Sequence, residues 1–163
     1  MNQPSPTFEI TTALRAPAAA VWKYAVTPEG INYELGPWVR MTMPKGLADD
    51  MTLDDVTPME PLGKSWIFVA KIIPMDYDDL CLAEIGPGMR FLERSKMATA
   101  KAWQHEREVM ATGEETCEIT DRLAIELRMP LRALGGKRIA PRIIRMLFTH
   151  RHKRLAERWG TPN

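Results

Sequence analysis

Apolar and polar positions follow the period of strands in some parts of the chain and that of helices in others. Residues 7–14, "TFEITTAL", alternate between two faces, which predicts a strand. The alanine-rich stretch after Pro17 predicts a helix to about residue 26. A second short helix is expected over residues 29–35, because Gly36 and Pro37 favour its end. The chain therefore begins in the order strand, helix, helix.

The middle of the chain, to about residue 128, has the period of strands. Turn-forming residues separate its segments, most clearly at residues 75–79 and 86–88. The acidic stretch Leu47–Glu60 is expected to be a surface loop or an edge segment. Six strands are expected here, at residues 38–44, 64–74, 80–85, 89–99, 102–112 and 116–127.

The C-terminal region predicts one long helix, at about residues 140–159. An apolar stripe at helical spacing supports it, formed by Ile143, Ile144, Leu147, Phe148, Leu155 and Trp159. Arg151 lies on this stripe. It either pairs with an acid in the core or extends to water from the edge of the stripe.

One strand, within "KAWQHEREVMATG" at residues 101–113, places charged side chains on its inner face. Trp103, His105 and Arg107 point to the same side, and buried polar groups need partners. Opposing Ser95 to His105 in the preceding hairpin sets Glu93 against Arg107.

The next hairpin, which turns through "TGEET", extends this inner row. It sets Arg107 against Asp121, His105 against Leu123 and Trp103 against Ile125. Glu93, Arg107 and Asp121 then form an inner triad of net charge minus one, which protonated His105 or Arg151 would balance. On the opposite face, Arg94, Glu106 and Arg122 form a solvated triad of little energetic weight.

The inner triad has two interpretations. It is a salt-bridge network that fixes the strand register, or it is the polar end of an apolar cavity where a ligand carboxylate, hydroxyl or carbonyl binds. A metal site of His105, Glu93 and Asp121 is disfavoured, because Arg107 between the carboxylates would repel a cation.

Length and composition indicate the number of domains and the cellular compartment. The 163 residues suit one domain, residues 1–163, and the two cysteines, Cys81 and Cys117, are too few for a disulfide framework. Neither a secretion signal nor a run of about 18 apolar residues is present, so a cytoplasmic protein is expected.

Charge is unevenly distributed along the chain. Residues 1–127 hold 12 Lys and Arg against 20 Asp and Glu, whereas residues 128–163 hold 10 against the single acid Glu157. Such a tail attracts nucleic acid or an anionic membrane, or else it folds onto the acidic body. The last is the expectation, because no exposed aromatic stacking set accompanies the basic residues.

Several segments resemble a known superfamily. "EGINYELGPWVRMTMP", "SWIFVAKIIPMDYDDL", "GMRFLERSKM", "AWQHEREV" and "FTHRHKRL" are similar to an uncharacterised bacterial subgroup of the SRPBCC superfamily, the START-like, Bet v 1-like and polyketide cyclase-type proteins. The resemblance implies an α+β helix-grip fold. In that fold a seven-stranded antiparallel sheet wraps around the long C-terminal helix, two short helices join strands 1 and 2, and a cavity lies between sheet and helix.

Two functions remain open for such a chain. The first is the binding, for carriage or sensing, of a small apolar or amphipathic ligand in the cavity. The second is a cyclase or dehydratase in which His105 is the general acid or base, oriented by Ser95 or a carboxylate. The residues expected to meet the ligand are Glu93, Ser95, Trp103, His105, Arg107, Asp121 and Arg151.

The expected partners follow from these functions. A small hydrophobic or amphipathic molecule is the expected ligand, with no cofactor and no metal. Neither nucleic acid nor stable membrane insertion is expected, and a homodimer is left open.

Overall fold

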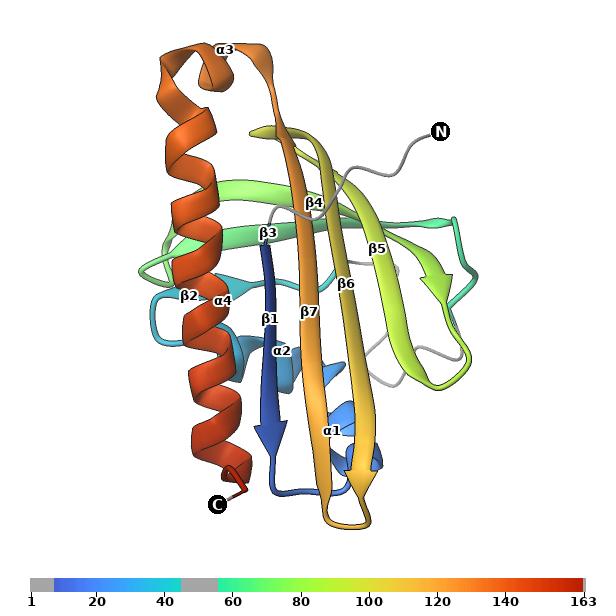
Figure 1. Ribbon diagram of the computed structural model, residues 1–163. Helices are drawn as coiled ribbons and strands as arrows, with labels where there is room; N and C mark the ends of the chain where they lie inside the picture. Colours follow the sequence, from blue (N-terminus) through green and yellow to red (C-terminus); the bar gives the residue numbers. More distant parts are fainter. Residues whose placement is uncertain (1–7, 45–55, 163) are drawn as a thin grey trace.

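The computed structural model describes residues 8–44 and 56–162 (Figure 1). Seven strands form one antiparallel sheet in the order β1-β7-β6-β5-β4-β3-β2. The elements are β1 (Phe8–Leu14), α1 (Ala18–Ala25), α2 (Pro28–Leu35), β2 (Val39–Met41), β3 (Pro61–Val69), β4 (Ile73–Ile85), β5 (Met89–Met97), β6 (Ala100–Gly113), β7 (Thr116–Leu127), α3 (Met129–Leu131), η2 (Arg132–Gly136) and α4 (Lys137–Trp159).

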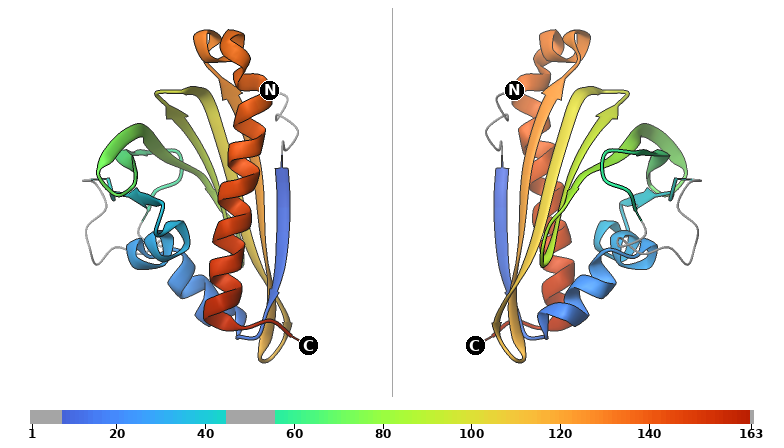
Figure 2. Two further views of the ribbon diagram at one scale, coloured as in Figure 1. Left: turned by 90° about the vertical axis from the view of Figure 1, so that its left-hand side faces the viewer. Right: turned by 90° about the vertical axis from the view of Figure 1, so that its right-hand side faces the viewer.

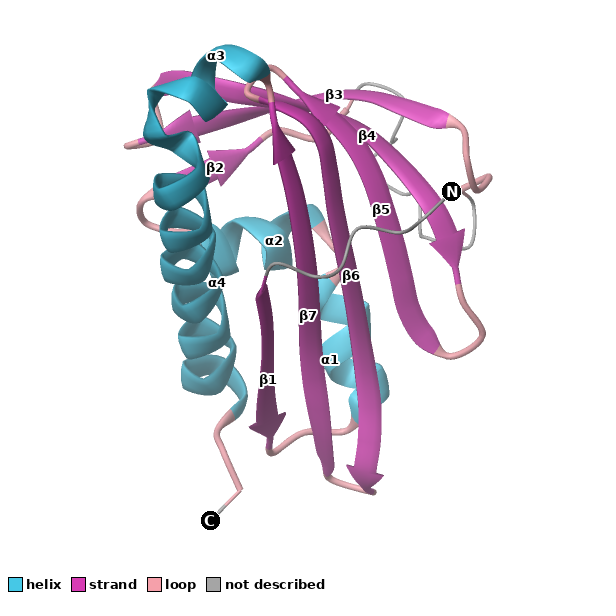
Figure 3. Ribbon diagram, turned by 45° about the horizontal axis from the view of Figure 1, so that its top comes forward, coloured by secondary structure: helices cyan, strands magenta, loops and turns pink. Residues whose placement is uncertain are grey.

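The sheet curls, and α4 closes the open side of the curl. In Figure 1, β1, β7 and β6 run along α4, whereas β4 and β3 run across that direction. The side views in Figure 2 show α4 between the two ends of the curled sheet, where it packs on β1 and α2. Figure 3 shows α1 and α2 on the same side of the sheet as α4. The predicted helix-grip architecture is confirmed.

Local sequence signals set the ends of α2. The Thr27 hydroxyl accepts a hydrogen bond from Gly30 N at 3.0 Å, and Pro28 occupies the first turn, where its missing N–H costs nothing. A side chain at Gly30 would collide with the backbone oxygen of Tyr24, so α1 and α2 approach closely only with glycine there. These contacts fix the start of α2 and its position against α1.

The hairpin of β3 and β4 differs from the prediction. The expected strand 64–74 contains the turn, because Ala70 and Lys71 take positive φ values of 50° and 66°. The turn expected at 75–79 lies inside β4 instead. Neither turn residue is a glycine, asparagine or aspartate, so the usual sequence signal of a left-handed turn is missing.

The two predicted hairpin registers had different outcomes. The pairing of β6 with β7 is confirmed, with Arg107 opposite Asp121 and His105 opposite Leu123. The pairing of β5 with β6 was wrong by two residues, since His105 lies opposite Glu93 and not opposite Ser95. A shift of two residues keeps every side chain on its face, so the alternation of faces could not exclude it.

A carboxylate from another strand stabilises the β5–β6 turn at residues 98–99, two residues earlier than expected. Asp76 of β4 accepts a hydrogen bond from the backbone N–H of Ala98 at 2.8 Å and another from the hydroxyl of Thr99. On the outer face, the shift replaces Arg94 by Arg90 as the partner of Glu106, which Arg122 also contacts. The predicted outer triad was therefore wrong in one member.

The tail residues that follow β7 have few acidic partners. Among the described residues, Arg151 is the arginine of the tail that pairs with an acid from the body of the chain, and His152 contacts Asp121 of the body. Lys153 and Arg154 pair with Glu157 inside α4. Within the part of the chain that the structure describes, ion pairing of the tail with the acidic body therefore involves Arg151 and His152. Most of the acidic stretch Leu47–Glu60 lies outside the described residues.

The structure also shows the state of the two cysteines and the lengths of the helices. Cys81 and Cys117 are both free thiols, and burial raises the pKa of each. No helix within residues 8–44 and 56–162 is long and apolar enough to cross a membrane.

Candidate functional site

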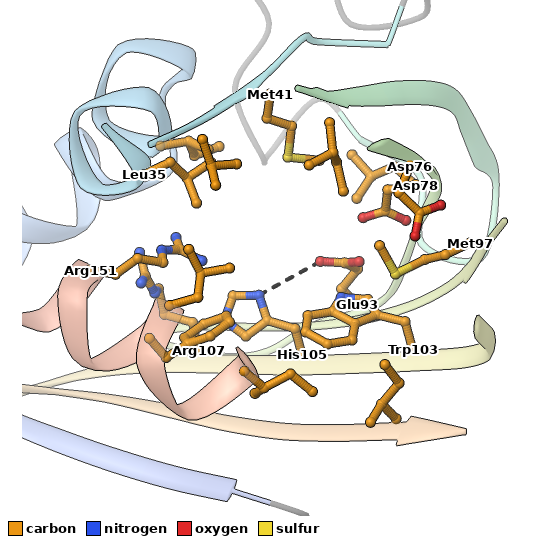
Figure 4. A pocket seen from close by; sticks show the side chains of 18 of the residues that line it. Leu35, Met41, Asp76, Asp78, Glu93, Met97, Trp103, His105, Arg107 and Arg151 are labelled. Carbon is orange, nitrogen blue, oxygen red and sulfur yellow. Dashed lines mark ion pairs between the residues drawn. The ribbon is translucent and has the colours of Figure 1, made fainter. Parts of the chain in front are cut away.

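A cavity of about 420 Å³ lies between the curled sheet and the helices α2 and α4. Its wall is mostly apolar, and its charged side chains lie in one row across β4, β5, β6 and α4 (Figure 4). We call this the polar row; it consists of Asp76, Asp78, Glu93, His105, Arg107 and Arg151. Apolar lining residues include Leu35, Met41, Leu80, Met97, Trp103 and Phe148.

Arg107 anchors one end of the polar row. Its Nε and Nη2 donate to the two oxygens of Asp121 at 2.7 Å each, and its Nη1 and Nη2 donate to the two oxygens of Glu34 at 2.9 Å each. The predicted contact between Arg107 and Asp121 is confirmed. Glu34, on α2, takes the place that the sequence analysis gave to Glu93.

Helix α4 adds two more groups to this end. Arg151 is buried and donates from Nε to Glu34 at 2.9 Å, so it pairs with a core acid and does not extend to water. His152 donates from Nε2 to Asp121 at 3.0 Å, while its Nδ1 lies 2.8 Å from the hydroxyl of Thr12. Four elements, α2, β6, β7 and α4, therefore meet in one ion network.

His105 occupies the middle of the polar row. Its Nε2 donates to Asp121 Oδ1 at 2.9 Å, and its Nδ1 lies 3.7 Å from Glu93 Oε2, the ion pair drawn in Figure 4. The latter distance exceeds a hydrogen bond. The ring of Phe148 packs edge-on against the imidazole, with centroids 5.2 Å apart.

Glu93, Ser95 and Asp78 form the other end of the row. The hydroxyl of Ser95 donates to Glu93 Oε1 at 2.8 Å and accepts from the backbone N–H of Cys81 at 3.3 Å. Asp78 is hydrogen-bonded to Glu93 through its carboxyl group. Its second oxygen, Oδ1, has no hydrogen-bond partner among the described residues, although the side chain is buried.

Burial and neighbouring charges shift the pKa values of Asp78 and Glu93 in opposite directions. Burial, reinforced by the charge and hydrogen bond of Glu93, raises the pKa of Asp78 to about 10. Burial alone would raise the pKa of Glu93 too, but the nearby imidazole of His105 and the hydrogen bonds with Asp78 and Ser95 lower it. At neutral pH the pair therefore holds one proton.

The Arg107 end is fully ionised. Burial alone would raise the pKa of Asp121, but the charge and hydrogen bonds of Arg107 hold it well below its ordinary value. Burial alone would lower the pKa of Arg107, and the charges of Asp121 and Glu34 raise it instead. These shifts are mutual, as expected for a closed ion network.

The sequence of the chain places it in a family. Residues 12–159 match the family described as "Domain of unknown function (DUF8410)". The chain belongs to this family. No curated protein matches it in sequence.

Solved structures show the same fold as this DUF8410 domain. A START superfamily protein from Mycobacterium smegmatis is 10% identical, with a TM-score of 0.63 over 92% of this chain and 97% of that chain. Protein CV1439 from Chromobacterium violaceum is 12% identical, with a TM-score of 0.67 over 96% and 97%. A norcoclaurine synthase point mutant from Thalictrum flavum, in complex with a transition state analogue, is 10% identical, with a TM-score of 0.58 over 93% and 94%. These likenesses confirm the START-like fold.

The DUF8410 domain brings the expected site residues close together. Glu93, Ser95, His105, Arg107, Asp121 and Arg151 are all buried in or beside the polar row, and Trp103 lines the cavity next to it. No group of three or more His, Cys, Asp or Glu within residues 8–44 and 56–162 is arranged to hold a metal ion.

Sequence reasoning missed four members of the site in this DUF8410 domain: Glu34, Asp76, Asp78 and His152. Glu34 lies in the last turn of α2, where an acid opposes the helix dipole, and that position was the available signal. Asp76, like Asp78, was assigned to the turn expected at residues 75–79, which is in fact part of β4. His152 directly follows Arg151, and no pattern distinguished it from a surface residue.

Proposed function

We propose that this protein binds a small, largely apolar molecule in the cavity between its sheet and α4. The supporting observation is the cavity itself, which has a volume of about 420 Å³, an apolar wall and a short row of polar groups on one side. Binding pockets for small molecules have this composition, with a few polar groups that fix the orientation of the ligand. The START-like fold supports the same function.

A pair of neighbouring residues on α4 provides the test. Leu147 lines the cavity, whereas Met146 is 68% exposed and points away from it. A Leu147→Trp substitution should fill part of the cavity, and we expect it to weaken binding of the neutral fluorescent probe N-phenyl-1-naphthylamine at least about tenfold. Met146→Trp should leave the affinity unchanged. Failure of the wild-type protein to bind the probe would contradict the proposal.

A cyclase or dehydratase is the second candidate, and the position of His105 favours it. The imidazole lines the cavity, Asp121 orients it through Nε2, and Nδ1 makes no hydrogen bond, so Nδ1 can serve a substrate as acid or base. His105→Ala separates the two functions. An enzyme loses turnover with an unchanged fold, whereas a carrier loses only part of its affinity.

A further inference from the structure

We infer that the ligand of the cavity carries a protonated amine on an apolar body, and that the amine binds to Asp78 and Glu93. This inference rests on the proposed function and specifies the class of ligand. It places the polar group of the ligand at the acidic end of the polar row and its apolar part against the wall of the cavity.

The first argument is an unsatisfied acceptor. Asp78 is 3% exposed, lines the cavity, and leaves Oδ1 without a hydrogen bond among the described residues. Figure 4 shows its carboxyl group beside Glu93 and facing the cavity. Buried polar atoms of native proteins are nearly always paired, because an unpaired one costs about 1–3 kcal/mol. A buried carboxyl group in the cavity wall that has an oxygen without a donor favours a ligand that supplies one.

The second argument comes from the strand beside Asp78. Ser65 of β3 lies directly opposite Asp78 in the register of β3 and β4 and is fully buried. Its hydroxyl also lacks a hydrogen bond among the described residues. Two adjacent residues of one cross-strand pair are therefore both unsatisfied, whereas the neighbouring Ser95 makes two hydrogen bonds.

The third argument excludes the opposite kind of ligand. A ligand carboxylate would need the guanidinium groups of Arg107 and Arg151, which are the arginines that line the described cavity. Arg107 already donates four hydrogen bonds to Asp121 and Glu34, and Arg151 donates to Glu34. An anionic ligand would compete with Glu34 and Asp121 for these guanidinium groups, whereas a donor at Asp78 competes with no acid.

Charge also favours a cationic donor over a neutral one. Asp76, Asp78 and Glu93 lie together at this end, and no lysine or arginine among the described lining residues lies beside them (Figure 4). A cation there gains a charge-assisted hydrogen bond, which is about twice as strong as a neutral one. The apolar wall requires that the rest of the molecule be hydrocarbon-like, which an amine satisfies and a hydrated metal ion does not.

The test compares three probes with the same chain length: decylamine, decanol and decanoate, below their aggregation concentrations. Displacement of N-phenyl-1-naphthylamine at pH 7 gives the affinities. We expect decylamine to bind at least about tenfold more tightly than decanol, and decanoate to bind more weakly than decanol. Equal affinity for the amine and the alcohol would overturn the inference while leaving the proposed function intact. Failure of all three probes would contradict the proposed function itself.

Variants locate the amine. Asp78→Asn leaves the negative charge of Glu93 in place but removes one of the two carboxyl partners of the amine, so it should reduce the preference for decylamine. Its circular dichroism spectrum should match that of the wild type, which would show that the variant is folded. Asp79→Asn removes an acid from the opposite face of β4 and should keep the full preference, since Asp79 pairs across the sheet with Lys64 and Lys96. Glu93→Gln is the second variant and should reduce the preference in the same way. Retention of the preference by both Asp78→Asn and Glu93→Gln would overturn the inference.

Discussion

The two ends of the polar row both hold buried acids, but they differ in how completely those acids are paired. At the Arg107 end, both oxygens of Glu34 and both oxygens of Asp121 accept hydrogen bonds from buried cations. At the Asp78 end, two acids share one proton, and one oxygen has no hydrogen-bond partner within residues 8–44 and 56–162. Saturated ion networks hold elements together, whereas unsaturated polar groups beside a cavity are available to a ligand.

Arg107→Ala should have the largest effect, because it leaves Glu34 and Asp121 buried without their main partner. We expect a loss of about 3–5 kcal/mol in the free energy of unfolding, measured by urea denaturation. Arg122→Ala is the control on the outer face, where the side chain is 34% exposed, and should cost less than about 1 kcal/mol. Equal losses for the two variants would show that the Arg107 end does not hold the fold.

Asp78→Asn should act in the opposite direction and stabilise the ligand-free protein. The pKa of Asp78 is raised from 3.8 to about 10, so the stability that the neutral carboxyl contributes is complete below pH 3.8 and is lost as the pH rises towards 10. Asparagine cannot ionise. At pH 8 the variant should therefore be more stable than the wild type by about 1–4 kcal/mol, and the difference should shrink towards pH 4. A difference that does not depend on pH would contradict this account.

His105→Ala should cost less than Arg107→Ala, because Asp121 keeps its bonds from Arg107 and His152. We expect a loss of about 2 kcal/mol in the free energy of unfolding. His152→Ala is the matched comparison, since this histidine has polar partners at both ring nitrogens and His105 has a hydrogen bond at one. His152→Ala should therefore cost more. The reverse order would show that His105 belongs to the structural end of the row.

A pair of serine variants has the smallest expected effect and compares the two kinds of polar group directly. Ser95→Ala removes hydrogen bonds to Glu93 and Cys81 and should cost about 1–2 kcal/mol. Ser65→Ala removes an unpaired hydroxyl and should change the free energy of unfolding by less than about 0.5 kcal/mol, or raise it. An equal loss for Ser65→Ala would mean that its hydroxyl is satisfied in solution.

The sequence predicted most of the fold because the deciding signals are local. The strand period predicted the number of strands, although the bounds of β3 and β4 were wrong, and the apolar stripe with Arg151 predicted α4. The turn "TGEET" fixed the pairing of β6 with β7, so the contact between Arg107 and Asp121 followed. The β5–β6 register failed because Asp76, an acid of another strand, stabilises the turn that sets it.

The unpredicted part of the site depends on contacts between distant segments. Glu34 reaches Arg107 only after α2 has packed over the cavity, and nothing near Glu34 in the sequence specifies that partner. Asp78 was predicted to lie in a turn and not in a strand. The hairpin of β3 and β4 instead turns at Ala70 and Lys71, which are not typical turn residues. Only the folded structure, with its curled sheet, brings both residues into the site.

Glu34 also bears on when this protein can fold. It accepts hydrogen bonds from residues 73 and 117 positions later in the chain, on β6 and α4. A ribosome releases Glu34 and Arg107 well before Arg151 and His152, so a growing chain that buried them early would trap incompletely paired charges. Contacts of such long sequence separation slow folding, and the cost of the unpaired charges delays closure of the core until the last helix has been synthesised.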